Sequence, residues 1–323
     1  MYPQSRVREP PISPIPLTRL APSPTGALHL GNAFSFLINW AIARKLSWNI
    51  ILRIEDLDVS RVHEGMIEDC LNTLKWLGID WDGQPILQSS DMNRFHTGMQ
   101  ALAKARRVYP CDLSHKQIQE ALNAPQLGDQ PDAAGYEAIR PDPIPDRFDN
   151  PETSWRFIPD DNPIRFHDHN MGPQAFSKTD LGEDFIVWTK RQAPSYQLAV
   201  VIDDHASGIN RVVRGRDLID STPRQLMLYR ALGFTPEPEY THLPLILSPD
   251  GRRLAKRDLD THIGSYSALG GPERVIGLIA HWVGITPEPT PMSTSEFLDT
   301  FDPHTLPKND IVFREEDAQW LRS

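Results

Sequence analysis

The sequence contains little cysteine and no long hydrophobic run. Only two of its 323 residues are cysteine, Cys70 and Cys111, and they stand far apart. This excludes a disulfide framework and is typical of a reducing compartment. No stretch of about 18 or more residues is apolar, so no segment qualifies as a membrane-spanning helix. We therefore expect a cytoplasmic protein without a membrane partner.

Positive charge is also scarce. The 33 Lys and Arg residues are outnumbered by 43 Asp and Glu residues, which gives a formal net charge of −10. Because phosphate contacts carry much of the affinity for nucleic acids, an RNA-binding protein with this balance must gather its basic residues in a few places. The candidate groups are Arg211, Arg214, Arg216 and Arg224, followed by Arg252, Arg253, Lys256 and Arg257. An ordinary solvated charged surface is the alternative interpretation.

The most informative segment is a strand, turn and helix near the start. Leu17 to Ala21 predicts a strand, Pro22 to Gly26 breaks it, and Ala33 to Lys45 predicts a mostly apolar helix. The unbonded N–H groups and the positive dipole end of such a helix point toward the turn. His29, in the step His29-Leu-Gly31-Asn32, can donate to phosphate oxygens there. A chance histidine in an ordinary turn is the alternative.

Two further segments supply what a nucleotidyl-transfer site would need. Residues 51–58 are rich in β-formers and end in Glu55, Asp56 and Asp58, which puts acids at the carboxyl end of a strand, where open α/β sheets bind ligands. Residues 245–257 predict a strand, a tight Pro-Asp-Gly turn and a basic loop suited to clamping a polyphosphate.

In this order the segments resemble the class I aminoacyl-tRNA synthetases, whose hallmarks are a His-x-Gly-His-type step and a Lys-Met-Ser-Lys-Ser-type loop. His29–Asn32 and Arg253–Arg257 occupy those places. The resemblance is greatest to the glutamyl branch, with Arg-x-Ala-Pro-Ser-Pro-Thr-Gly at residues 19–26 and Arg-Ile-Glu-Asp at residues 53–56. Residues 196–205 and 212–224 continue the same pattern, which covers residues 17 to about 284.

The length of the sequence distinguishes between two groups within the glutamyl branch. Ordinary glutamyl-tRNA synthetases continue into helical domains that read the anticodon, whereas this sequence ends at Ser323. It is more similar to the short glutamyl-queuosine tRNA(Asp) synthetases, which esterify glutamate to the queuosine base of the tRNA(Asp) anticodon. The residues from Asp220 to Gln225 also favour this group. The resemblance implies L-glutamate, ATP with Mg²⁺ and a tRNA as partners of a monomer. Two alternative functions remain: a truncated glutamyl-tRNA synthetase that charges tRNA(Glu), and a non-catalytic RNA-binding paralogue.

The resemblance also implies roles for individual residues. His29 and Lys256 are the expected catalytic residues, because they would stabilise charge growing on the phosphates of ATP. ATP binding is expected of His29, Gly31, Asn32, Arg253 and Lys256. Glutamate binding is expected of Arg19, Ser23, Glu55, Tyr196 and Arg214, since guanidinium groups pair with a side-chain carboxylate and Glu55 can accept from the substrate ammonium.

Other residues of these motifs have alternative or structural interpretations. Tyr196 could instead be part of the hydrophobic core. We expect structural or capping roles for Asp56, Asp58, Asp203 and Asp204, and assign no role to His205. In the basic loop, Arg253 and Ala255 depart from the Lys and Ser of the family, which affects only fine positioning.

The expected fold class is α/β, a Rossmann-like class I synthetase catalytic domain with an inserted subdomain, a small helical C-terminal region that contacts a tRNA stem, and no anticodon-binding domain. The expected divisions are a flexible leader (1–16), the first catalytic half (17–107), an acceptor-binding-like insert (108–184), the second half (185–247), and the basic loop with the helical region (248–323). Strands are predicted at 17–21, 49–54, 185–189, 197–203 and 211–214, and helices at 33–45, 64–77, 91–107 with Asp91 as N-cap, 222–232, 272–284 and 315–321.

The insert departs from the family pattern. Many members bind zinc there through Cys-x-Cys followed by a Tyr and a last Cys, but Cys111-Asp-Leu113 supplies one thiolate and residues 136–140 supply none. Asp112, His115 and His167 are the candidate substitutes. Because a structural zinc needs about four closed ligands, we expect none. We also expect residues 111–151 to be more mobile than the sheet around them, because few apolar residues anchor them.

Overall fold

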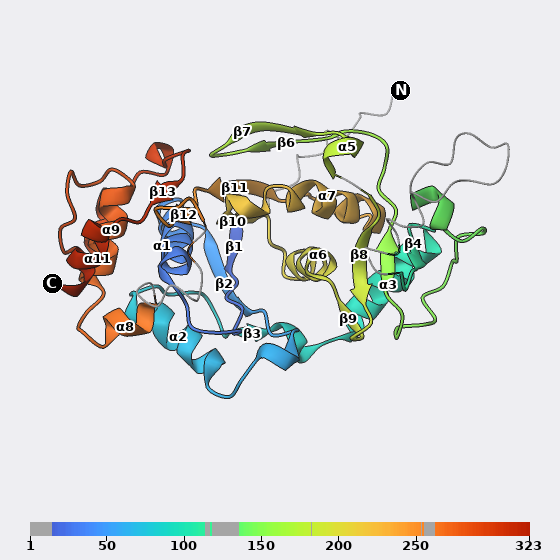
Figure 1. Ribbon diagram of the computed structural model, residues 1–323, viewed down its shortest axis with the longest axis horizontal. Helices are drawn as coiled ribbons and strands as arrows, with labels where there is room; N and C mark the ends of the chain where they lie inside the picture. The colour runs from blue at the N-terminus through green and yellow to red at the C-terminus, as the bar shows by residue number, and fades with distance from the viewer. Residues whose placement is uncertain (1–14, 114–116, 118–135, 182, 253, 255–261) are drawn as a thin grey trace, which may run out of the picture.

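The computed structural model describes residues 15–113, 117, 136–181, 183–252, 254 and 262–323 (Figure 1). Most of the expected leader therefore lies outside the described residues, as do His115, Arg253, Ala255, Lys256 and Arg257.

The strands are β1 (Leu17–Leu20), β2 (Asn49–Ile54), β3 (Ile86–Leu87), β4 (Val108–Pro110), β5 (Trp155–Phe157), β6 (Ile164–Asp168), β7 (Gly172–Phe176), β8 (Phe185–Thr189), β9 (Ala193–Pro194), β10 (Arg211–Gly215), β11 (Glu239–Leu243), β12 (Ile246–Leu247) and β13 (Ile311–Val312). The α-helices are α1 (Leu30–Lys45), α2 (Met66–Trp76), α3 (Asn93–Lys104), α5 (Lys178–Leu181), α6 (Tyr196–Ala206), α7 (Ser221–Leu232), α8 (Ile263–Ser267), α9 (Glu273–Trp282), α10 (Thr294–Thr300) and α11 (Glu315–Arg322). Short 3-10 turns include η1 (Val59–Arg61) and η4 (Arg216–Leu218).

Parallel strands form the centre of the molecule. β1 pairs with β2 in parallel, β2 pairs with β3, and β10 pairs in parallel with β11. β1 lies beside β10, because the Asn210 N–H donates to the Leu17 carbonyl at 3.1 Å. Helix α1 connects β1 to β2, which makes a βαβ unit. This arrangement confirms the predicted α/β, Rossmann-like fold class.

The two faces of this sheet bury different cores. Leu20, Leu52 and Val213 pack with α1 and α9 in one hydrophobic cluster, whereas Leu17 and Ile51 lie against a second cluster built from α3, α6 and α7. Figure 1 shows α1 and α6 on opposite sides of the central strands. Because successive side chains of a strand point to opposite faces, the odd-numbered residues of β1 and β2 face α6.

The segment expected to be an insert, residues 108–184, pairs with β8 and β11, which follow it in the sequence. β4, β5, β8 and β9 form an antiparallel sheet, so strand pairing joins residues on both sides of position 184. β6 and β7 form a hairpin, and β6 also pairs in parallel with β11 at Tyr240 and Asp168. The hairpin therefore brings residues of the expected insert into contact with β11.

Most predicted elements are confirmed, with two corrections. The strand predicted at residues 197–203 is wrong, because these residues lie in helix α6. Leu198 to Ile202 are all buried between neighbouring elements, and a fully buried helix gives the same continuous apolar run as a buried strand. Helix α3 has Met92, not Asp91, at its N-cap; the Asp91 carboxylate accepts the backbone N–H of Asn93 at 3.0 Å.

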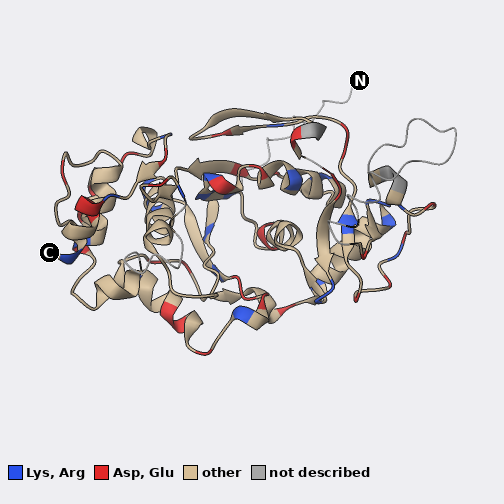
Figure 2. Cartoon of the chain, in the orientation of Figure 1, with Lys and Arg blue, Asp and Glu red and all other residues tan. Residues whose placement is uncertain are grey.

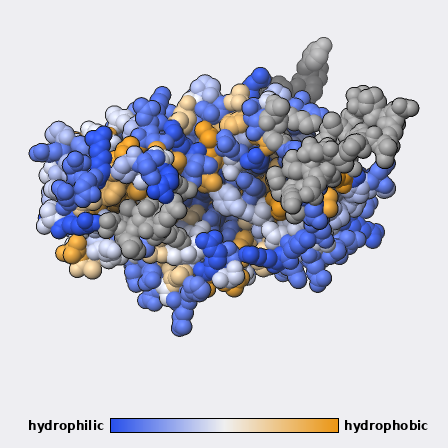
Figure 3. All heavy atoms as spheres, in the orientation of Figure 1, coloured by the Kyte–Doolittle hydropathy of each residue, from blue (hydrophilic) through white to orange (hydrophobic). Residues whose placement is uncertain are grey.

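The expected first basic group does not form a patch. Arg214 is buried, Arg211 pairs with Glu239 at 2.8 Å, and Arg216 pairs with Asp310. Figure 2 shows Lys and Arg interspersed with Asp and Glu along the described chain, and the face in Figure 3 is largely hydrophilic with scattered apolar side chains. Nowhere in the described part of the chain is a helix long and apolar enough to cross a membrane.

Candidate functional site

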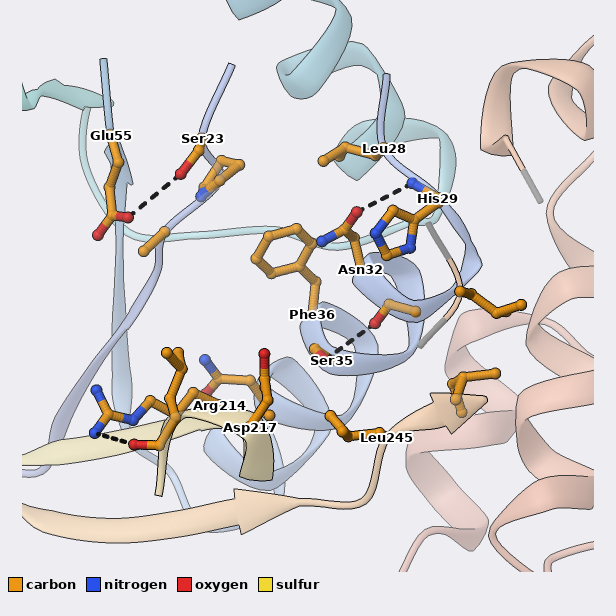
Figure 4. Close-up of a pocket in the computed structure, with 18 of the residues that line it drawn as sticks. Ser23, Leu28, His29, Asn32, Ser35, Phe36, Glu55, Arg214, Asp217 and Leu245 are labelled. Carbon is orange, nitrogen blue, oxygen red and sulfur yellow. Dashed lines mark hydrogen bonds between the residues drawn. The ribbon is translucent and has the colours of Figure 1, made fainter. Parts of the chain in front are cut away.

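A cavity of about 410 Å³ opens where β1, β2 and β10 end and α1 begins. Its lining includes every expected site residue that the structure describes: Arg19, Ser23, His29, Gly31, Asn32, Glu55, Tyr196 and Arg214. In Figure 4, Ser23 and Glu55 lie on one side of the cavity and His29 and Asn32 on the other, with Arg214 and Asp217 along a third. The described structure thus brings together residues nearly two hundred positions apart.

Lys256 and Arg253, the other expected ATP ligands, lie outside the described residues. Leu254, which stands between them in the sequence, lines the cavity and is buried. Its N–H donates to the Ile246 carbonyl at 3.2 Å, which continues the pairing of β12. The basic loop therefore borders the cavity at this residue.

The start of α1 forms one side of the cavity. His29 occupies the N-cap with an extended backbone, and its N–H donates to the Asn32 side chain at 3.1 Å. A Cβ at Gly31 would lie 3.2 Å from Cε1 and Nδ1 of His29, so glycine leaves room for the imidazole ring. The helix start, with its dipole and N–H groups, suits an anion.

On the opposite side, the lining residues Arg19 and Glu55 contact charged side chains buried between the sheet and α6. Arg19 from β1 and Arg53 from β2 both contact Asp204 of α6, through Arg19 Nε at 3.3 Å and Arg53 Nη1 at 2.6 Å. Arg53 Nη2 also lies 3.3 Å from Oε1 of Glu55. A buried chain of alternating charge thus connects two residues expected to bind glutamate.

The pKa values of the two acids in this charged network, Glu55 and Asp204, are shifted in opposite directions. Burial raises the pKa of Glu55, although Arg53 and Arg19 partly counter it. Burial also acts on Asp204, but there the guanidinium groups of Arg53 and Arg19 outweigh it and hold the pKa below its ordinary value. Asp204 is therefore a fixed anion that positions the arginines, as expected for a structural partner.

Asp56 and Asp203, two of the other acids expected to be structural, accept hydrogen bonds from neighbouring residues. Asp56 accepts from the backbone N–H and the hydroxyl of Ser89, at 2.8 and 2.6 Å. Asp203 accepts from Gln88 and Arg94, each at 2.6 Å. His205, to which no role was assigned, stacks on Phe234 with ring centroids 3.6 Å apart.

The guanidinium group of Arg214 is already hydrogen-bonded to several protein groups. Its Nε donates to His242 at 3.1 Å, Nη1 to Gln225 at 2.9 Å, and Nη2 to Thr222 at 2.7 Å and to the Leu218 carbonyl at 3.3 Å. These four bonds use most of the N–H donors of the guanidinium group. Arg214 thus presents a fixed edge to the cavity instead of an open fork.

Tyr196 and Ser23 face a second cavity as well. Tyr196 is 40% exposed, so the alternative of a core position is wrong. Together with Ser23 and Glu55 it separates the first cavity from one of about 600 Å³, whose lining includes Asp58, Ser60 and Arg191. Ser23 Oγ lies 3.5 Å from Oε2 of Glu55 at this boundary.

Sequence reasoning missed several residues of the site. Asp217 and Asn39 line the cavity, and Asn39 connects α1 to β1 by donating to the Arg19 carbonyl at 3.0 Å. Arg53, which is 1% exposed, was noted only as part of the Arg-Ile-Glu-Asp motif, and no role was predicted for it. A charged residue in the middle of an otherwise apolar strand was the available signal, since an arginine buried there needs an anionic partner.

The candidate zinc ligands that the structure describes, Cys111, Asp112 and His167, do not gather into a metal site. Cys111 packs with Tyr109 and Tyr136, while Asp112 lies 3.3 Å from Nζ of Lys190. Arg140, where the family pattern ends in cysteine, pairs with Asp184 at 2.7 Å. Within the described ranges, no three His, Cys, Asp or Glu side chains group closely enough to hold a metal. His115 lies outside those ranges, and the absence of zinc stays a prediction.

Comparison with known proteins places the chain in a family. The profile "tRNA synthetases class I (E and Q), catalytic domain" matches residues 17–320. A Glutamyl-Q tRNA(Asp) synthetase of Symbiobacterium thermophilum is 39% identical over 306 residues, covering 91% of this chain and 94% of the relative. The corresponding protein of Rhodopirellula baltica is 40% identical over 310 residues, covering 91% and 93%.

Ordinary glutamate ligases match less of their own length. A Glutamate–tRNA ligase of Synechococcus sp. (strain WH7803) is 38% identical over 263 residues, which are 78% of this chain and 55% of that protein. The crystal structure of a glutamate–tRNA synthetase from Elizabethkingia anophelis superposes with a TM-score of 0.75 at 25% identity, covering 95% of this chain and 70% of that one. The chain therefore belongs to the class I tRNA synthetases of the glutamate and glutamine type and is an aminoacyl-tRNA ligase.

Proposed function

We propose that this protein activates L-glutamate with ATP and transfers it to the queuosine base in the anticodon of tRNA(Asp). The observation that carries the proposal is the single cavity in which two arginines and a carboxylate, suited to the charges of glutamate, face a helix start suited to phosphate. The near full-length similarity to proteins named Glutamyl-Q tRNA(Asp) synthetase supports the choice of acceptor.

Glutamate would lie between Arg19, Arg214 and Glu55. Its side-chain carboxylate would pair with the arginines, and its ammonium would donate to Glu55. Because Asp204 and His242 already hold the two arginines, little side-chain freedom would be lost on binding. Glutamine carries no charge for these arginines, which favours glutamate.

Activation would need no side-chain nucleophile. The α-carboxylate oxygen of glutamate attacks the α-phosphorus of ATP, the bond to the bridging oxygen breaks, and pyrophosphate leaves. Class I synthetases use Mg²⁺ with ATP, and a magnesium ion that keeps several waters and binds the phosphates needs no dedicated protein cage. His29 and the start of α1 would stabilise charge on the phosphates, with Lys256 from the basic loop.

Transfer would take place from the side of the second cavity. A hydroxyl of the acceptor attacks the carbonyl carbon of glutamyl-adenylate, loses its proton to solvent or base, and AMP leaves. We propose that the acceptor enters through the 600 Å³ cavity, because Ser23, Glu55 and Tyr196 border both spaces.

Charging of tRNA(Glu) is the second candidate, favoured by the 38% identity to a Glutamate–tRNA ligase. The two functions are separated by aminoacylation with labelled glutamate and three acceptors: tRNA(Asp) carrying queuosine, the same tRNA without it, and tRNA(Glu). We expect label only on the first. Label on tRNA(Glu) alone would establish the second candidate, and label on none, with adenylate formed, would refute both acceptors.

A further inference from the structure

The side of Arg214 away from the cavity is occupied by a buried histidine. His242 stands directly opposite Arg214 in the register of β11 with β10. Its side chain is fully buried, and Nε2 accepts the N–H of Arg214 Nε at 3.1 Å. Thr222 Oγ1, which itself accepts from Arg214, lies 3.2 Å from the same nitrogen. His242 therefore contacts the guanidinium group on the side away from the cavity.

A carboxylate from the insert fixes the other ring nitrogen. Asp168, at the end of β6, is also fully buried, and its Oδ2 lies 2.6 Å from Nδ1 of His242. Because an ionised carboxylate only accepts, Nδ1 carries the proton and Nε2 keeps its lone pair for Arg214. Backbone N–H groups of Asn170, Met171 and His242 also donate to Asp168, which anchors the hairpin turn on β11.

From this chain of contacts we infer that Asp168 and His242 are a positioning pair for Arg214, and that the pair holds Arg214 in its glutamate-binding orientation only while His242 is neutral. The inference rests on the proposed role of Arg214 in binding glutamate. It gives the inserted hairpin a part in amino-acid recognition, although no hairpin residue is among those lining the described cavity.

The charges around His242 agree with a neutral ring. Asp168, Asp217 and Arg214 act on it, and the ring of Tyr240 stacks parallel to it with centroids 6.0 Å apart. Burial lowers the pKa of His242, and Arg214 lowers it further, against the opposing effects of Asp168 and Asp217. Protonation at Nε2 would replace the acceptor of Arg214 with a second cation at 3.1 Å.

The sign of the pH dependence follows. The ring is neutral above its lowered pKa, so Arg214 stays in place at neutral and basic pH. As the pH falls through that pKa, the imidazolium displaces Arg214 and the KM for glutamate rises. Glu55, whose pKa is raised by burial, also loses its charge on the acid side. A variant that removes only the titration of His242 is therefore needed.

The experiment measures glutamate-dependent pyrophosphate exchange between pH 5.5 and 8.5 for wild type, His242→Gln, His242→Phe, Arg214→Ala and Thr241→Val. Glutamine keeps an acceptor for Arg214 and a donor for Asp168 without titrating. Phenylalanine removes both. Thr241 is the neighbour of His242 on β11 and points to the other face, so it controls for disturbing the strand.

We expect His242→Phe to raise the KM for glutamate about tenfold at pH 8 with the KM for ATP within about twofold, as for the loss of a buried hydrogen bond to a charged group. His242→Gln should stay within about threefold of wild type at pH 8 and show a smaller rise at acid pH. Thr241→Val should match wild type throughout.

Other outcomes are decisive. An unchanged glutamate KM in His242→Phe, or equal rises for glutamate and ATP, would overturn the inference. So would an acid-side rise in His242→Gln as large as in wild type. If Arg214→Ala itself leaves the glutamate KM unchanged, the proposed role of Arg214 fails, which is distinct from failure of the pair alone.

Discussion

The two sides of the cavity are built in different ways. The side expected to hold glutamate is made of charged side chains fixed by other buried charges, with Arg53 1% and Asp204 2% exposed. The side expected to hold phosphate is made of the backbone at the start of α1, with a glycine that leaves room for one imidazole. A small ligand with charges at three points needs side chains held in advance, whereas a helix start binds phosphate through groups that every helix has.

Removing the centre of the charged side should have the largest effect. Arg53→Met leaves Asp204 and Glu55 buried with less compensation, so we expect a loss of about 3–5 kcal/mol in the free energy of unfolding, measured by urea denaturation. The control is Arg44→Met, because Arg44 pairs with the exposed Asp80 and Asp82 and should contribute no more than about 1 kcal/mol. Equal losses in both variants would contradict the conclusion that buried charges fix the charged side of the cavity.

Removing the substrate-facing arginine should act on binding. Arg214→Ala removes one of the two buried arginines expected to pair with the glutamate carboxylate, which should weaken glutamate binding by roughly 2–4 kcal/mol. Calorimetric titration of the protein with glutamate measures this directly. Unaltered affinity would show that the carboxylate binds elsewhere, for example to Arg19 alone.

Removing the phosphate-facing groups should act on the rate. We expect His29→Ala or Lys256→Ala to lower the rate of adenylate formation on the order of 10²-fold and to leave glutamate affinity nearly intact, because these groups act mainly on the transition state. Single-turnover measurements separate the two quantities. Rates near that of wild type would mean that other groups contact the phosphates.

The smallest expected effect concerns metal in the insert. Elemental analysis of the purified protein should find no stoichiometric zinc, and a chelator should leave its melting temperature unchanged, since only Cys111 remains of the expected sulfur ligands. One zinc per chain together with unfolding on chelation would point to an unconventional site that includes residues such as Asp112 or His115.

Some local elements were predictable from the sequence, and others were missed or mistaken. The β1–α1–β2 unit was placed to within a few residues, because Pro and Gly mark its turn and its helix is long. Helix α10 was missed although Ser293 and Glu296 form a capping box, a signal readable in the sequence. Helix α6 was mistaken for a strand because its apolar run is buried all round.

Long-range partnerships were not predictable. The family resemblance implied that Arg19, Glu55 and Arg214 bind glutamate, but no local pattern indicated that Asp204 would join Arg19 to Arg53 or that Asp168 would reach His242. These contacts depend on which faces meet once the sheet has formed, and pairing across tens to hundreds of positions leaves no local pattern. For the same reason Arg214 was counted as part of a basic surface, although it is buried.

The central claim is that one cavity binds glutamate and ATP in a state ready to react. Pyrophosphate exchange without tRNA tests it most directly, with glutamine in place of glutamate as the control. The account predicts ATP–pyrophosphate exchange with glutamate and ATP alone, and none with glutamine. Exchange that requires added tRNA would contradict the account and favour an ordinary glutamyl-tRNA synthetase, and exchange with glutamine equal to that with glutamate would contradict the roles of Arg19 and Arg214.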